Sequence, residues 1–188
     1  MTEKTEGYTL TRAEAYQLID GERAYQTSRW GHHKHGAGAF LTYLWNYYRV
    51  MEAVDSTVDA DGPAHDAAKD AMRKFAALCV ACMEENGVVF RGQEPLTGPR
   101  LRTTIYQAID QERDYQEGLG GDRAQRPQGK RRLHQFSEFL TMLRHYLTQA
   151  DAAWTGKAGQ VAALDVIRKL AAIAVRGMEV HGAPARQI

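Results

Sequence analysis

Residues 19–26 read Ile-Asp-Gly-Glu-Arg-Ala-Tyr-Gln, and ninety residues later residues 109–116 read Ile-Asp-Gln-Glu-Arg-Asp-Tyr-Gln, so six of eight positions are identical. A helix needs apolar residues along one face, but helix formation has no need for a Glu-Arg-x-Tyr-Gln string. The segment is therefore either a buried polar network that holds the fold together or the wall of a binding site. Its return predicts that the chain contains two related units.

Helical patterns surround both copies in the same order. In the first copy, a capping box of Thr11 and Glu14 predicts a helix start. The Gly- and His-rich loop 28–36 and two further apolar-periodic segments follow, over about 39–55 and 64–86. In the second copy the helices are expected over 104–117, 136–154 and 161–180, with a loop over 118–133.

No segment shows the alternation of a strand bounded by turns. The expected fold is therefore all-α, a tandem duplication of a three-helix unit packed as a pseudo-twofold helical bundle. The first unit covers residues 1–90 and the second 103–188, and the Gly- and Pro-containing stretch 91–102 is the linker between them. Such an internal dimer could act alone or form a homo-oligomer.

The composition is that of an ordinary globular protein, with 44% hydrophobic and 25% charged residues. No apolar run is long enough for a membrane span, and the first residues do not resemble a signal peptide, so a cytoplasmic protein without a membrane partner is expected. A net charge of +1 and the lack of a basic helical stripe argue against nucleic acid. Cys79 and Cys82 have apolar neighbours and are expected to be plain buried thiols.

Charge is distributed unevenly along the chain. Residues 1–94 hold 10 Lys/Arg and 14 Asp/Glu, whereas residues 95–188 hold 14 and 9. The loop after the first helix is cationic in both copies and leads into a helix N-terminus, which favours anions. A solvated basic loop is the alternative, particularly for residues 130–132. The His-His-x-His string at residues 32–35 lacks nearby carboxylates and is a weak metal signal, so no metal site is expected.

The residues Glu22-Arg23-x-x-Gln26-x-x-x-Trp30-Gly31 resemble MazG-like all-α nucleotide pyrophosphohydrolases, especially small phage-encoded proteins that open with this motif. That resemblance implies a nucleotide as ligand and a host cytoplasm as location. The enzymes of the family hold Mg²⁺ with Glu-Glu-x-x-Glu on helix two and Glu-x-x-Asp on helix three. Neither copy has this acidic set, since residues 44–52 and 143–151 each contain a single carboxylate.

The leading hypothesis is a non-catalytic binder of a small phosphorylated ligand, without a cofactor. If the phage resemblance is right, the protein would be an anti-defence sponge that sequesters a nucleotide immune signal. Guanidinium groups would hold phosphates, Glu and Gln would read base or ribose, and aromatic rings would stack. The expected ligand-binding residues are Glu22, Arg23, Tyr25, Gln26, Trp30, His35, Tyr47, Arg73, Glu112, Arg113, Tyr115, Gln116, Arg131, Arg132, His134, Tyr146 and Arg168.

Two alternatives remain open at this point. A divergent pyrophosphohydrolase would hold Mg²⁺ with Glu22, Glu52, Asp66 and Asp70. In a structural or inhibitory protein–protein interaction module, the repeated polar residues would lock the fold and the aromatic second helix would be the interface.

Overall fold

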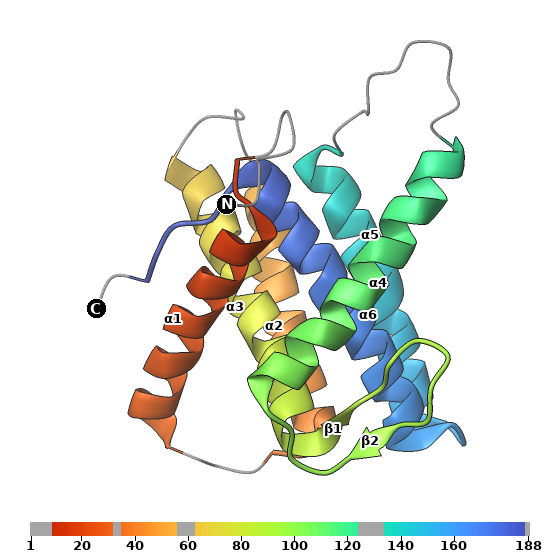
Figure 1. Cartoon of the computed structure of the whole chain (residues 1–188). Helices are drawn as coiled ribbons and strands as arrows, with labels where there is room; N and C mark the ends of the chain where they lie inside the picture. Colours follow the sequence, from red (N-terminus) through yellow and green to blue (C-terminus); the bar gives the residue numbers. More distant parts are fainter. Residues whose placement is uncertain (1–8, 32–34, 56–62, 124–133, 187–188) are drawn as a thin grey trace.

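The computed structural model describes residues 9–31, 35–55, 63–123 and 134–186. These residues form six helices and one short antiparallel strand pair, in the order α1 (Arg12–Trp30), α2 (Ala37–Asp55), α3 (Pro63–Asn86), β1 (Gly87–Val88), β2 (Leu96–Thr97), α4 (Arg102–Arg123), α5 (Phe136–Thr155) and α6 (Gly159–His181) (Figure 1). The expectation of an all-α fold is confirmed, and the β1–β2 pair is an addition that the sequence pattern did not indicate.

Four helices form the centre of the molecule. Helix α3 packs against α6, α2 lies on α3, α5 lies on α6, and α2 also contacts α5. Helices α1 and α4 lie on the outside of this bundle, where each contacts both α3 and α6 (Figure 1). The helices that carry the two Glu-Arg-x-Tyr-Gln segments therefore both rest on the central α3–α6 pair.

One continuous hydrophobic core joins all six helices. It includes fully buried large side chains from both halves of the chain, among them Leu44, Phe75, Phe139 and Leu170, and each such side chain stabilises the fold by roughly 1.5–3 kcal/mol. The thiols of Cys79 and Cys82 are buried and unpaired, as expected, and burial raises the pKa of both. The two halves consequently share a core and do not form separate globules.

Two helices are longer than the sequence pattern predicts. Helix α1 continues through residues 28–30 and ends where the N–H of Gly31 donates to the carbonyl of Thr27, so Trp30 lies on a helix and not in a loop. Helix α4 begins at Arg102 and continues past Gly118 to Arg123. Glycine costs only about 1 kcal/mol within a helix, so it weakens the expectation of a helix without excluding one.

Gly87 directly follows the last residue of α3 and opens strand β1. Its φ of 110° is one that residues with a side chain rarely adopt, and a Cβ placed there would lie 2.3 Å from the carbonyl oxygen of Leu96. The hairpin connection therefore returns the chain to the base of α4 through a glycine-dependent close approach. None of the helices that the structure describes has the length and apolarity of a bilayer-crossing segment.

Candidate functional site

The glutamates of the two Glu-Arg-x-Tyr-Gln segments are buried against arginines of the central helices. Glu22 on α1 is 2% exposed, and its Oε2 lies 3.1 Å from Nη2 of Arg73 on α3. Glu112 on α4 is 3% exposed, and its Oε2 lies 3.2 Å from Nη1 of Arg168 on α6. Because a buried charge is costly unless it is paired, these contacts hold each outer helix on the bundle.

Each of these buried arginines also contacts an aspartate on its own helix. Arg73 lies 2.5 Å from Asp70, and Arg168 lies 2.6 Å from Asp165. The backbone carbonyl of Pro184 accepts a further hydrogen bond from Arg73. The guanidinium groups of both arginines are therefore occupied by partners within the chain.

A second arginine reaches each buried glutamate from a connecting segment. Arg186, which follows α6, lies over the ring of Tyr25 at 3.6 Å and is 3.9 Å from Glu22. Arg91, which follows α3, lies over the ring of Tyr115 at 3.2 Å and is 3.4 Å from Glu112. The motif tyrosines are thus covered by cation–π contacts.

The motif arginines pair with glutamates at the ends of α3 and α6. Arg23 lies 2.8 Å from Glu84, which also accepts a hydrogen bond of 2.6 Å from Arg102 at the start of α4. In the other half, Arg113 lies 2.6 Å from Glu179, which Arg12 at the start of α1 approaches at 3.4 Å. Each glutamate therefore joins one arginine of its own half to one arginine of the other half.

The first helices of the two halves meet through tyrosines. Tyr16 and Tyr106 stack with their ring centroids 4.1 Å apart, and their hydroxyls donate to Asp110 and Asp20 respectively, both at 2.7 Å. Burial raises the pKa of both tyrosines, and the neighbouring aspartates raise it further. Both hydroxyls consequently remain donors at physiological pH, which keeps this contact between the halves intact.

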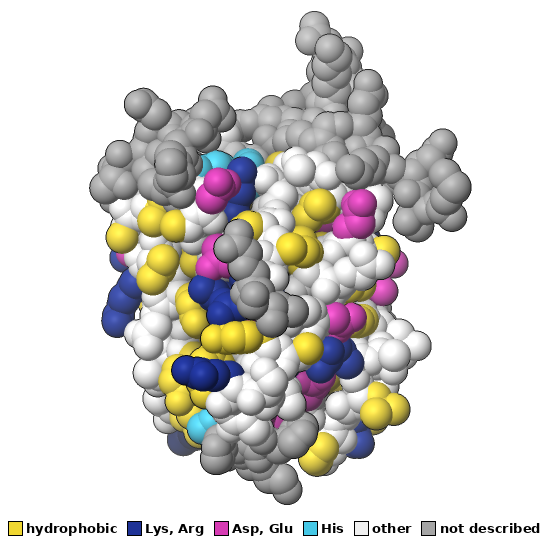
Figure 2. All heavy atoms as spheres, turned by 90° about the vertical axis from the view of Figure 1, so that its left-hand side faces the viewer, with side chains coloured by type: hydrophobic (Ala, Val, Ile, Leu, Met, Phe, Trp, Pro, Cys, Tyr) yellow, Lys and Arg dark blue, Asp and Glu magenta, His cyan; other side chains and the backbone are white. Residues whose placement is uncertain are grey.

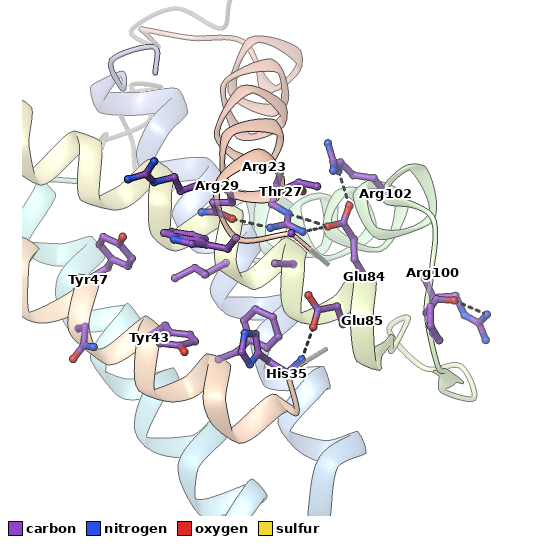
Figure 3. A pocket seen from close by; sticks show the side chains of 18 residues that line it. Arg23, Thr27, Arg29, His35, Tyr43, Tyr47, Glu84, Glu85, Arg100 and Arg102 are labelled. Atoms are coloured by element: carbon purple, nitrogen blue, oxygen red, sulfur yellow. Dashed lines mark hydrogen bonds and ion pairs between the residues drawn. The ribbon is translucent and has the colours of Figure 1, made fainter. Parts of the chain in front are cut away.

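A cavity of about 930 Å³ opens beside the first copy of the motif (Figure 3). Its wall comes from α1, α2, α3 and the segment that leads into α4. Five of the residues singled out from sequence line it, namely Arg23, Gln26, Trp30, His35 and Tyr47. The structure adds Thr27, Arg29, Gly31, Phe40, Tyr43, Asn46, Leu78, Ala81, Glu84, Glu85, Pro99, Arg100 and Arg102.

The ionised side chains of the cavity leave an excess of positive charge, since four arginines face two glutamates. Arg23 and Arg102 share Glu84, and Arg100 donates to the backbone carbonyls of Thr97 and Pro99. Arg29 is exposed in the last turn of α1 and forms no ion pair with any residue that the structure describes. An anion that enters the cavity would therefore find a guanidinium that no carboxylate of the described residues neutralises.

Aromatic rings line the other side of the cavity. Trp30 is 53% exposed and Tyr43 is 41% exposed, although both are large and largely apolar. The ring of His35 contacts Tyr43 edge-on at 5.9 Å, and its backbone N–H donates to Glu85 at 2.8 Å. Tyr43 and Tyr47 lie at one end of the cavity and Arg100 and Arg102 at the other (Figure 3). Hydrophobic and basic side chains also lie side by side on the face of the molecule around α1 (Figure 2).

The remaining expected site residues lie elsewhere. Gln116 donates to Glu112 at 3.2 Å, His134 contacts Phe139 edge-on, and Tyr146 contacts His145. Arg131 and Arg132 lie outside the described residues, as do His32 and His33 of the weak metal motif. Within the described ranges, no three or more His, Cys, Asp or Glu side chains form a group that could hold a metal ion.

The carboxylates of the hydrolase alternative are engaged by other side chains of the protein. Glu22 and Asp70 share Arg73, and Asp70 also pairs with Lys74. Asp66 lies 3.9 Å from Lys69, and Glu52, which belongs to neither of these groups, accepts from the hydroxyl of Tyr48. Sequence reasoning missed Glu84 and Glu85 as site residues, although residues 83–84 and 178–179 are both Met-Glu and that repetition marks a constrained position.

No family model, curated protein or solved structure matches the chain.

Proposed function

We propose that the chain is a tandem duplication of one three-helix unit. Residues that make corresponding contacts are 90 positions apart on α1 and α4, as for Glu22 and Glu112, and 95 apart on α3 and α6, as for Arg73 and Arg168. The contacts of the connecting arginines, the shared glutamates and the stacked tyrosines follow the same two offsets. One unit that originally paired with a copy of itself would account for all of them.

We further propose that the first half binds a small phosphorylated ligand with an aromatic ring, most simply a nucleotide. The observation that carries this proposal is the position of Arg29 beside exposed aromatic rings in a cavity of about 930 Å³. Pockets for small ligands typically measure about 300–1,000 Å³ and combine apolar walls with a few convergent polar groups.

The cavity residues suggest separate roles. Arg29, together with the Arg23 side of the Arg23–Glu84–Arg102 cluster, would attract the phosphate. Trp30 and Tyr43 would contact the base, because an exposed ring gains most when a planar partner covers it. Gln26 and Glu85 carry the hydrogen-bonding groups that could read the edge of a base or a ribose hydroxyl.

In this proposal the repeated motif both stabilises the fold and contributes to the ligand site. Glu22, with its partner Arg73, holds α1 on the bundle, whereas Arg23 and Gln26, on the neighbouring positions of the same helix, face the cavity. Binding without turnover is preferred because the acidic set expected for metal-dependent hydrolysis is missing from the sequence of the second helix. Sequestration of a signalling nucleotide is the role that such binding would serve.

Isothermal titration calorimetry with ATP, ADP-ribose and a cyclic dinucleotide tests the proposal. Arg29→Ala and Trp30→Ala should each weaken binding of the nucleotide by about tenfold or more, since a charge-assisted hydrogen bond or one base stack is worth roughly 1–3 kcal/mol. Arg144→Ala is the matched control, because Arg144 is an exposed arginine on α5 that does not line the cavity. The proposal fails if no probe binds, or if Arg144→Ala weakens binding as much as Arg29→Ala does.

A further inference from the structure

Two positions of the cavity wall differ in a coordinated way between the halves. Thr27 on α1 and Ala81 on α3 line the cavity of the first half. The 90- and 95-residue offsets place Glu117 on α4 and Arg176 on α6 at the corresponding positions. Two short side chains in one half are thus replaced by two long side chains of opposite charge in the other.

Glu117 is the centre of a cluster of arginines. Its Oε1 accepts hydrogen bonds from Nη2 of Arg113 at 2.7 Å and from Nη2 of Arg12 at 3.2 Å. Nη1 of Arg176 lies 3.7 Å from the same oxygen, and the Arg176 side chain is only 13% exposed. The long side chain of Arg176 is thus largely covered next to Glu117, whereas Ala81 leaves the equivalent volume open.

The hydrogen-bond partners of the motif arginine, Arg23 in the first half and Arg113 in the second, also differ between the halves. In the first half, Nη1 of Arg23 donates to Oε1 of Gln26 at 2.8 Å, and both residues face the cavity. In the second half, Arg113 donates to Glu117 and Glu179. Gln116 donates to Glu112 just as Gln26 donates to Glu22, so the difference lies in the arginine. Glu117 therefore binds Arg113 on the side where, in the first half, Arg23 binds Gln26 and faces the cavity.

Other ligand-facing identities have also changed. Residues 40–44 of α2 read Phe-Leu-Thr-Tyr-Leu and residues 139–143 of α5 read Phe-Leu-Thr-Met-Leu, so the aromatic Tyr43 corresponds to Met142. The 95-residue offset pairs the acidic Glu85 with Val180. By sequence alone, Trp30 corresponds to Gly120. The second half thus lacks two of the rings that the first half presents, and Leu119 stands at the position of Arg29. The rings of His35, Phe40 and Tyr47 are retained as His134, Phe139 and Tyr146.

From this geometry we propose that the Glu117–Arg176 ion pair closes a second binding site, so that each chain binds one ligand, in its first half. This inference rests on the proposed function, because it concerns the number of sites of the kind described there. In the second half, the side chain of Arg176 would fill the volume that a ligand occupies in the first half.

Titration calorimetry with ADP-ribose on three proteins tests the inference. The wild-type chain should bind one equivalent. Glu117→Thr with Arg176→Ala, which restores the first-half residues at these two positions, should bind two. The second equivalent should be about a hundredfold or more weaker, because Leu119 and Gly120 stand at the positions of Arg29 and Trp30 and each loss is worth about tenfold or more. Thr27→Glu with Ala81→Arg, which transfers the ion pair to the first half, should lose detectable binding. Thermal melting by circular dichroism checks that each variant is folded.

The outcomes separate this inference from the proposal on which it rests. If the wild-type chain binds one equivalent and the opened variant also binds only one, the closed second site is wrong and the binding function stands. Two equivalents in the wild-type chain also overturn the closed site. Wild-type affinity in a folded Thr27→Glu variant with Ala81→Arg would contradict the idea that this pair blocks a ligand. Absence of binding by every protein overturns both proposals.

Discussion

The buried Glu22–Arg73 pair makes a prediction about stability that does not depend on any ligand. Arg73→Ala removes a guanidinium that is 1% exposed. Among the described residues, it leaves Glu22, 2% exposed, with the distant Arg186 at 3.9 Å as its one cationic partner. A carboxylate without a close partner in the core loses its hydration and gains little in exchange. The variant should therefore be much less stable than the wild-type protein.

The expected loss is about 3–5 kcal/mol, which is typical when one partner of a buried ion pair is removed. For a chain of 188 residues, each 1 kcal/mol shifts the melting temperature by about 2–4 °C, so Tm should fall by about 6–20 °C. Lys74→Ala is the matched control, because Lys74 contacts Asp70 at 2.5 Å but is 23% exposed. Its ion pair should contribute less than about 1 kcal/mol.

Urea unfolding followed by circular dichroism measures both variants. A third protein, Glu22→Leu with Arg73→Met, replaces both charges by apolar side chains and should recover most of the loss. Equal losses for Arg73→Ala and Lys74→Ala would refute the reasoning. A double replacement that is no more stable than Arg73→Ala would show that the unpaired charge of Glu22 is not the cause of the loss, since that charge is absent from the double replacement.

Three further predictions concern single positions. Gly38→Ala should lower Tm, since a Cβ there would lie 2.6 Å from Nε1 of Trp154. Gly21→Ala should raise stability by up to about 1 kcal/mol through helix propensity, because a Cβ at that position meets no atom within 4 Å. A thermal melt in which Gly21→Ala has the lower Tm of the two would contradict the packing described. Burial lowers the pKa of His181, and the nearby positive groups of His65 and Lys69 lower it further, so the unfolded chain binds the proton more readily and the stability linked to His181 is lost as pH falls below about 6.5. Asparagine at this position can keep the hydrogen bond to the carbonyl of His134, as Asn86 does with the carbonyl of His35. The Tm of His181→Asn should therefore fall less than the Tm of the wild-type protein when the pH is lowered from about 7.5 to about 5.5. Equal decreases in Tm would exclude this role of His181.

The helices could be predicted from the sequence because their apolar residues recur at helical spacing and glycine or proline interrupts the pattern. The capping box at Thr11 and Glu14 is present in the structure, and α2, α5 and α6 begin and end within two residues of the expected positions. The length of α4 was underestimated because contacts along the helix, including those of Glu117, outweigh the low helix propensity of the glycines.

The wall of the cavity could be anticipated only in part. Arg23, Gln26 and Trp30 are three and four residues apart, so their common face follows from helix geometry alone. The adjacent residues Arg73 and Lys74 show the limit of this reasoning, since both are basic but only the first is buried. The role of Arg102 depends on how the halves meet, which no local pattern encodes.

The crossed pairing of Arg12 and Arg102 has a consequence for how the polypeptide could be divided. Each arginine begins the first helix of one half and neutralises carboxylates of the other, so neither half carries a complete set of partners by itself. A backbone cut in the connection between α3 and α4 would leave these ion pairs and the α3–α6 contact in place. The two fragments should then remain together through gel filtration and reassemble after separate denaturation, so that the protein could be handled as a two-piece reconstitution system.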